Sequence, residues 1–304
     1  MLLLSKFFSY MRRNYQLYLL ILPAFASVVL FSYVPMYGVQ IAFKNFRPAR
    51  GIAGSSWVGL EHFARFLKTP FFYRIVYNTV GISVYSLVAG FPIPIVLALL
   101  INEVRHPRLK KNIQMITYAP FFISTVAMCG MVLLFLKKDT GVVNALVTFF
   151  GGEATDFISK PQYLWSIYVW SGIWQGMGWS SIIYIAALSG VDPEVIEAAV
   201  IDGANRFQKI VYIDIPTILP TVVILLILSV GSLLGVGSEK MLLLQNSLNK
   251  DASEVISTYT YNLGVLQGQY DYTTAIGLFN STINALLLLG VNTVARRLGE
   301  TSLW

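Results

Sequence analysis

Few residues in this sequence of 304 have side chains that could do chemistry. There is one cysteine, Cys129, and there are two histidines, His62 and His106, in separate polar segments. A lone cysteine cannot form an intrachain disulfide, and two distant histidines do not have the spacing of a metal site. We therefore expect neither a metal site nor a catalytic residue in this chain.

One charged segment, Glu197–Pro216, lies between two long apolar runs. Asp192, just before it, precedes a proline and a glutamate, which is typical of a helix start. Gly203 can adopt the left-handed conformation that ends a helix, and residues 206–212 can form another turn or two. The sequence predicts two short helices around a sharp bend, outside the membrane, before Pro216 opens the next run.

The small side chains at this bend would let another protein approach the backbone closely. Alanines flank the bend, Glu197 and Asp202 offer charge, and Phe207 and Ile210 offer apolar contacts. These features suit a docking surface for a partner. From the residues alone, an ordinary amphipathic connecting loop fits equally well.

Aromatic and amide side chains within two other runs could hold a polar ligand, through stacking on its apolar faces and hydrogen bonds to its polar groups. At helical spacing, two tryptophans of the fourth run share a face and two asparagines of the sixth run share a stripe. Polar residues inside membrane spans usually face protein or a cavity, but such residues also form interfacial belts and interhelical hydrogen bonds. Both interpretations stay open. The candidate substrate-pathway residues are Trp170, Trp174, Gln175, Asn280, Ser281 and Asn284.

Long uncharged runs must position these residues. Hydrophobic residues make up 56% of the chain and charged residues 12%, about half the usual share for a soluble domain. Six runs each exceed the roughly 20 residues needed to cross a bilayer core. All 22 Lys and Arg and all 15 Asp and Glu residues lie outside them, as expected for six transmembrane helices. The runs are Tyr15–Phe43, Ile75–Asn102, Ile113–Leu136, Leu164–Val191, Thr217–Ser238 and Thr273–Ala295.

The first run has a second interpretation, because two arginines precede it and Ala24-Phe25-Ala26 has the form of a signal-peptide cleavage site. The run continues to Phe43, which is longer than a signal core and favours an uncleaved span. With a cytoplasmic amino terminus, the 22 basic residues divide into 11 inside and 11 outside, so charge alone does not settle orientation. Residues 44–74 and 239–272 would be outside loops, with a short helix over 60–67.

The pattern within Glu197–Pro216 resembles the EAA signature of type I importer permeases of the ATP-binding-cassette (ABC) class. It lies between the antepenultimate and penultimate spans, where such permeases carry it. The resemblance implies a cytoplasmic coupling helix seated in a cleft of the ATPase, and hence cytoplasmic termini. The matching positions are Glu197, Ala198, Ala199, Asp202, Gly203, Ala204, Phe207, Ile215 and Pro216, and the first seven are the expected ATPase-coupling residues.

Further motifs resemble the carbohydrate branch of this family, which is linked to polysaccharide, aldouronate and rhamnogalacturonan oligosaccharide uptake. The resemblance implies an all-α type I permease that imports oligosaccharides, uronic ones among them, by alternating access. The implied partners are a second, different permease chain, two ABC ATPase subunits, an extracytoplasmic solute-binding protein, membrane lipid and the oligosaccharide, with no nucleic acid. The motifs are Tyr33–Lys44, Leu243–Leu248, Gly268–Tyr272, Ala275–Phe279 and Gly299–Trp304.

No Gly-x-x-x-x-Gly-Lys-Ser/Thr phosphate loop occurs in the sequence. We therefore expect no enzyme activity and no cofactor in this chain, with ATP and magnesium bound by the partner ATPase. An ion-coupled secondary sugar carrier is the alternative, but such carriers bury charged residues, and the six runs have none.

The expected organisation is a multi-pass protein of the bacterial cell membrane with a single membrane domain. It comprises a cytoplasmic segment at 1–14, a peripheral first helix at 15–43, a five-helix core at 75–295 and a cytoplasmic tail at 296–304.

Overall fold

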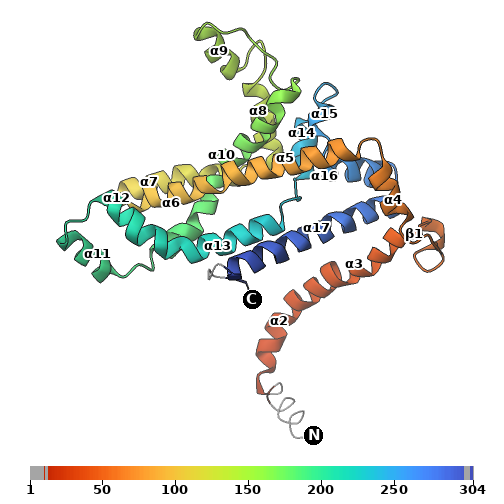
Figure 1. Cartoon of the computed structure of the whole chain (residues 1–304), viewed down its shortest axis with the longest axis horizontal. Coiled ribbons are helices and arrows are strands. Elements are labelled where there is room, and N and C mark those ends of the chain that lie inside the picture. Colours follow the sequence, from red (N-terminus) through yellow and green to blue (C-terminus); the bar gives the residue numbers. More distant parts are fainter. Residues whose placement is uncertain (1–9, 11–12, 298–301, 304) are drawn as a thin grey trace.

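The amino-terminal apolar run forms one long helix that leads away from the rest of the chain (Figure 1). The computed structural model describes residue 10, residues 13–297 and residues 302–303, so most of the expected segment 1–14 and most of the tail 296–304 lie outside the described residues. The most apolar stretch of this helix buries none of its residues within the chain, so lipid or another protein must cover it. The helix comprises α2 (Tyr15–Val28), η1 (Val29–Tyr33), α3 (Val34–Met36) and η2 (Tyr37–Phe43).

A small hairpin and a short helix follow. Strand β1 (Lys44–Asn45) pairs antiparallel with β2 (Ser56–Trp57) around η3 (Pro48–Arg50). Helix α4 (Glu61–Lys68) then buries Phe66 against Tyr272 and Ile276 of α17 (Tyr270–Arg297). The helix predicted over 60–67 is confirmed.

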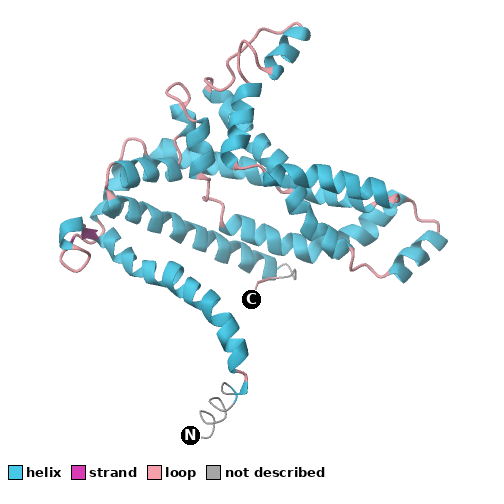
Figure 2. Ribbon diagram, turned by 180° about the vertical axis from the view of Figure 1, so that it is seen from behind, coloured by secondary structure: helices cyan, strands magenta, loops and turns pink. Residues whose placement is uncertain are grey.

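Four helices in the described part of the chain are long and apolar enough to cross a membrane. They are the first helix, the 31-residue helix Phe72–Asn102, the helix Arg206–Gly231 and α17. The second of these consists of α5 (Phe72–Gly90) and α6 (Pro92–Asn102). Its α6 part packs against α10 (Pro161–Leu188), and α17 packs against α13 (Ile215–Gly231), so the helices form a layered bundle (Figure 2).

The third predicted run is broken. It forms α7 (Pro107–Tyr118) and η4 (Ala119–Phe122), and then α8 (Thr125–Phe135) leaves at an angle of 99°. Ser124 starts the new helix, because its hydroxyl accepts a hydrogen bond from the amide of Ala127. Helix α8 leads to a lobe with α9 (Val142–Phe149), which projects from the bundle (Figure 1).

Helix α10 has the length of a span, at 28 residues, but it carries too many serines, glycines and ring side chains to count among the strongly apolar helices. It passes close to α7, because a Cβ on Gly178 would overlap the carbonyl oxygen of Thr117. The described residues therefore contain four candidate spans, or five with the bent pair, and the number six stays a prediction.

The charged segment between α10 and α13 folds as the sequence indicated, with one correction. Helix α11 (Pro193–Ile201) is followed by a bend and by α12 (Arg206–Lys209). Helix α12 then continues without a break through η5 (Ile210–Asp214) into α13. Pro216 therefore lies within this helix and does not open a separate span, and the π-helical turn η5 directly before it is the kind of local adjustment that accommodates a proline in a membrane helix.

The segment predicted as an outside loop at 239–272 is built into the fold. Helix α13 ends at Gly231, seven residues before the predicted end of the span at Ser238. Helix α14 then buries Met241 and Leu244 against Met128, Cys129 and Leu164. The elements here are α14 (Ser238–Leu244), α15 (Lys250–Ser253), α16 (Ile256–Thr260) and η6 (Tyr261–Leu266).

Candidate functional site

The exposed segment 192–209 lies at one end of the bundle, far from the hairpin at the other end (Figure 1). Asp192 caps α11, since its Oδ1 accepts a hydrogen bond from the amide of Glu194 at 2.9 Å. Gly203 has a φ of +80°, which favours glycine, and turns the chain sharply. Asn205 and Gln208 then exchange backbone-to-side-chain hydrogen bonds in a capping box that starts α12.

The seven expected coupling residues all lie on α11, the bend and the start of α12. Phe207 is 74% exposed, Ala198 is exposed, and Ala199 and Ala204 are half-buried. Glu197 and Asp202 are also exposed. The segment presents charge, small side chains and one large ring to the outside, as a docking surface would, and its role in coupling stays a prediction.

Lys209, at the end of this segment, connects the helix Arg206–Gly231 to the end of α6. Its ammonium forms an ion pair with Glu103, the residue after α6, and lies 3.3 Å from Oδ2 of Asp214. Asp214 is 0% exposed, and neither of its carboxylate oxygens accepts a hydrogen bond from the described residues. The Asp214 charge therefore depends on Lys209 as its counter-ion. The cluster of Glu103, Lys209 and Asp214, here called the anchor cluster, joins the end of α6 to the continuous helix of α12, η5 and α13.

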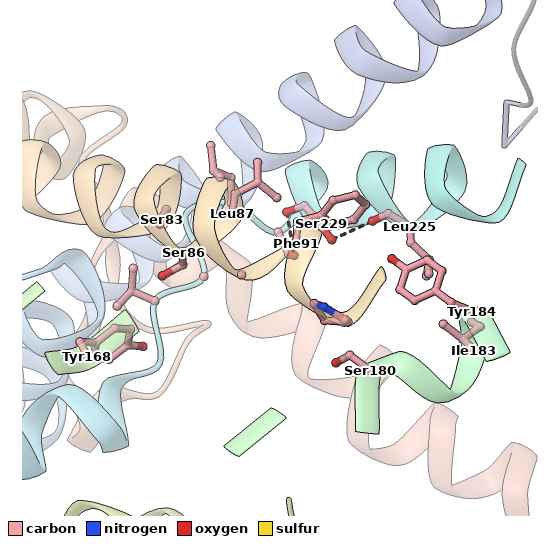
Figure 3. Close-up of a pocket in the computed structure, with 16 residues that line it drawn as sticks. Ser83, Ser86, Leu87, Phe91, Tyr168, Ser180, Ile183, Tyr184, Leu225 and Ser229 are labelled. Atoms are coloured by element: carbon pink, nitrogen blue, oxygen red, sulfur yellow. Dashed lines mark hydrogen bonds between the residues drawn. The ribbon is translucent and has the colours of Figure 1, made fainter. Parts of the chain in front are cut away.

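A cavity of about 500 Å³ lies between α5, α6, α10, α13 and the turn after α13. Tyr168 and Tyr184, both on α10, lie at opposite sides of it (Figure 3). They are sixteen residues apart, or about 24 Å along a helix, so the cavity is elongated. Its hydroxyl-bearing lining residues are Ser83, Ser86, Tyr168, Ser180, Tyr184, Ser229 and Ser232. We call it the central cavity.

The hydroxyls of the central cavity are not all occupied. Ser229 donates to the carbonyl oxygen of Leu225 at 2.7 Å, within its own helix. The Oγ of Ser83 is buried and has no hydrogen-bond partner among the described residues. An unpaired buried hydroxyl is costly, so Ser83 is a strained point in the cavity wall.

A second compartment of about 360 Å³ adjoins the central cavity and shares Ser86, Tyr168 and Ser180 with it. Lys240 of α14 lines this compartment. Its Nζ donates a hydrogen bond to the carbonyl oxygen of Tyr168 at 2.6 Å and lies 4.5 Å from the centre of the Tyr168 ring. Burial lowers the pKa of Lys240 to about 8, against a smaller opposing effect of Cys129. We call this space the lysine compartment.

Of the six candidate substrate-pathway residues, Gln175 lines the lysine compartment. Its side-chain nitrogen donates to the carbonyl oxygen of Ile123 at 2.8 Å, which leaves its oxygen free to accept a hydrogen bond. Trp170 and Trp174 are 50% and 44% exposed, and they are not among the residues that line either space. Trp170 donates instead to the hydroxyl of Tyr85.

The candidates on α17 hold the turn after α13. Asn284 accepts a hydrogen bond from the amide of Leu234 at 3.1 Å, and Asn280 donates to the carbonyl oxygen of the same residue at 3.4 Å. Ser281 is exposed. The two asparagines therefore position the backbone beside Leu233 and Gly235, which line the central cavity, and direct contact with a substrate stays a prediction.

Sequence reasoning missed Lys240, the cavity serines and the anchor cluster. The serines had a signal, because Ser83, Ser86, Gly90 and Pro94 recur at helical spacing within an apolar run. Lys240 had none, since it was counted as a residue of an outside loop.

Long apolar helices around a hydroxyl-lined cavity, with an exposed charged segment at one end, are features expected of a membrane permease. The family model for binding-protein-dependent transport system inner membrane components matches residues 90–300. The chain belongs to this family, and it is a multi-pass permease of the ABC transporter class.

Two relatives come from Bacillus subtilis strain 168. The polygalacturonan/rhamnogalacturonan transport system permease protein YteP is 41% identical over 288 residues, which is 95% of this chain and 90% of that protein. The protein LplB is 40% identical over 294 residues, 97% of this chain and 92% of its own length.

A solved structure shares the fold. It is a bacterial ABC transporter involved in the import of the acidic polysaccharide alginate, with 38% identity, a TM-score of 0.87 and coverage of 96% of this chain and 99% of that one. The type I permease fold predicted from the EAA pattern is confirmed. The ABC permease is favoured over the ion-coupled carrier.

Proposed function

We propose that this chain is the membrane-spanning subunit of an importer that takes oligosaccharides into the cell by alternating access. One arrangement carries the proposal. The helices α6 and α13 line the central cavity and also end in the anchor cluster, which holds the exposed segment 192–209. A partner that moves this segment moves two walls of the cavity.

The lining of the central cavity supports an oligosaccharide as the substrate. Serine and tyrosine hydroxyls match sugar hydroxyls, and about 24 Å of α10 accommodates several sugar units. The volumes of about 500 and 360 Å³ are those of ligand sites. Relatives named for polygalacturonan, rhamnogalacturonan and arabinooligosaccharide transport support the same substrate class.

The proposed partners supply energy and substrate. A pair of ABC ATPase subunits binds ATP and magnesium, because this sequence has no phosphate loop. A second permease chain covers the exposed apolar helices, and an extracytoplasmic solute-binding protein delivers the oligosaccharide. The alginate transporter in complex with a pentasaccharide-bound periplasmic protein supports that last assignment. In this arrangement segment 192–209 and both termini are cytoplasmic, in a bacterial cell membrane.

Copurification and transport test the proposal. The assembled complex in proteoliposomes should take up oligosaccharide only with ATP, and Phe207→Ala should lose the ATPase during purification because its exposed ring is the apolar anchor. Phe149→Ala is the matched control, since Phe149 is 82% exposed but lies on the α9 lobe. Normal ATPase retention and transport in the Phe207→Ala complex would contradict the coupling role.

A further inference from the structure

Lys240 is a mostly buried cation on a cavity wall that has no acidic partner among the described residues. Among the described residues, the basic members of ion pairs are His62, Arg74 and Lys209. The only hydrogen bond described for the Lys240 ammonium is the one to the Tyr168 carbonyl oxygen. An ammonium has three N–H donors, so two remain for a ligand or for water.

The fold makes room for this amine. A Cβ on Gly172 would lie 2.9 Å from Nζ, so the glycine lets the ammonium lie close to α10. The Tyr168 ring covers one side of it. The titratable groups around Lys240 are Cys129 on α8, Glu239 beside it and Tyr168 on α10. None is a carboxylate within ion-pair distance, so the positive charge is left for the contents of the compartment.

Lys44 shows what a purely structural lysine looks like in this protein. Its Nζ donates to the carbonyl oxygen of Ile52 at 2.7 Å and lies 5.0 Å from the centre of the Trp57 ring. These contacts match those of Lys240 in kind. Lys44 lies in the hairpin, however, and lines neither the central cavity nor the lysine compartment. The difference between the two is access to a ligand.

We propose that Lys240 binds the carboxylate of a uronic acid unit and thereby selects acidic oligosaccharides over neutral ones. This inference rests on the proposed function, and it names the substrate class and the residue that recognises the substrate. Ser86 and Ser180 line the same compartment and bind hydroxyls of that sugar unit, while the central cavity holds its neighbours. An ammonium beside a carboxylate in a sheltered site forms a charge-assisted hydrogen bond, which is about twice as strong as a neutral one.

The test compares two probes of one skeleton, trigalacturonate and its fully methyl-esterified, uncharged form. Uptake of each is measured in proteoliposomes with the complete complex and an unaltered binding protein. The ratio of acidic to neutral uptake should fall roughly tenfold in Lys240→Met, as expected from the loss of one hydrogen bond to a charged group. Lys240→Arg should largely keep the ratio, and Lys44→Met should leave it unchanged.

The outcomes separate the inference from the proposed function. A loss of both probes in equal proportion, or an unchanged ratio in Lys240→Met, would make the lysine a structural clamp between α14 and α10 and overturn the inference. A wild-type complex that prefers the neutral probe would overturn it as well. In each of these cases ATP-driven uptake persists in the wild type, whereas ATP-independent uptake or no uptake at all would refute the proposed function instead.

Discussion

Replacing Lys209 by methionine should damage the protein more than replacing its buried partner Asp214 by asparagine. Lys209→Met leaves the Asp214 carboxylate fully buried without a counter-ion, whereas Asp214→Asn removes the buried charge and keeps the pair of Lys209 with Glu103. At 3.3 Å and an effective dielectric constant of about 20, the Lys209–Asp214 attraction is about 5 kcal/mol. Measured losses on breaking a buried pair are about 3–5 kcal/mol.

The double variant makes this prediction sharp. Lys209→Met combined with Asp214→Asn leaves no fully buried charge, since the remaining Glu103 side chain is 18% exposed, so it should recover much of the stability that Lys209→Met loses. The assay is thermal unfolding of the purified permease complex, with midpoints compared in order, because a multisubunit assembly does not unfold in two states. From the highest unfolding midpoint to the lowest, we expect the order wild type, Asp214→Asn, double variant, Lys209→Met. A double variant at or below Lys209→Met would refute the reasoning.

Three further predictions concern particular positions. The acidic-to-neutral uptake ratio should fall as pH rises from 7 through about 8, because Lys240 then loses its proton, and Lys240→Arg should remove this dependence. Gly178→Ala should lower the unfolding midpoint, since its Cβ would overlap a backbone carbonyl of α7, while Gly176→Ala, with open space around it, should not. Gly203→Ala, strained by about 1–2 kcal/mol at φ +80°, should reduce ATP-coupled transport, whereas Gly151→Ala at φ +83° on the α9 lobe should not.

Local signals in the sequence were enough to predict the elements that depend on local chemistry. The exclusion of every charge from the six runs indicated where apolar helices lie, because lipid penalises charge strongly, although the third run is bent by 99°. Asp192 and Gly203 predicted the start and the end of α11, since capping and a left-handed turn involve only neighbouring residues. The structure confirms the helix cap at Asp192 and the left-handed turn at Gly203.

Contacts between distant residues could not be predicted in this way. Lys209 meets Glu103 across 106 positions of sequence, and no periodicity connects them. The turn after the early end of α13 is held by Asn284, whose side chain accepts a hydrogen bond from a backbone amide 50 residues earlier. Because α13 ends early, the chain turns back and Lys240 lines the lysine compartment. The predicted span to Ser238 had instead placed Lys240 in a loop outside the membrane. Both functional clusters that the sequence missed are therefore tertiary in origin.

Under the proposed function, the positions of these clusters give a route by which movement of segment 192–209 reaches the central cavity. A buried apolar cluster of Leu99, Tyr184 and Ile218 joins α6, α10 and α13. Tyr184 also lines the central cavity, so this cluster adjoins the cavity on the side of the bundle end that carries segment 192–209. The anchor cluster connects the end of α6 to the start of α13, nearer to segment 192–209 than the apolar cluster. A sugar that leaves the cavity toward this end would have to pass between the residues of the apolar cluster, so α6 and α13 would have to move apart. These are the two helices that the Lys209–Glu103 ion pair connects.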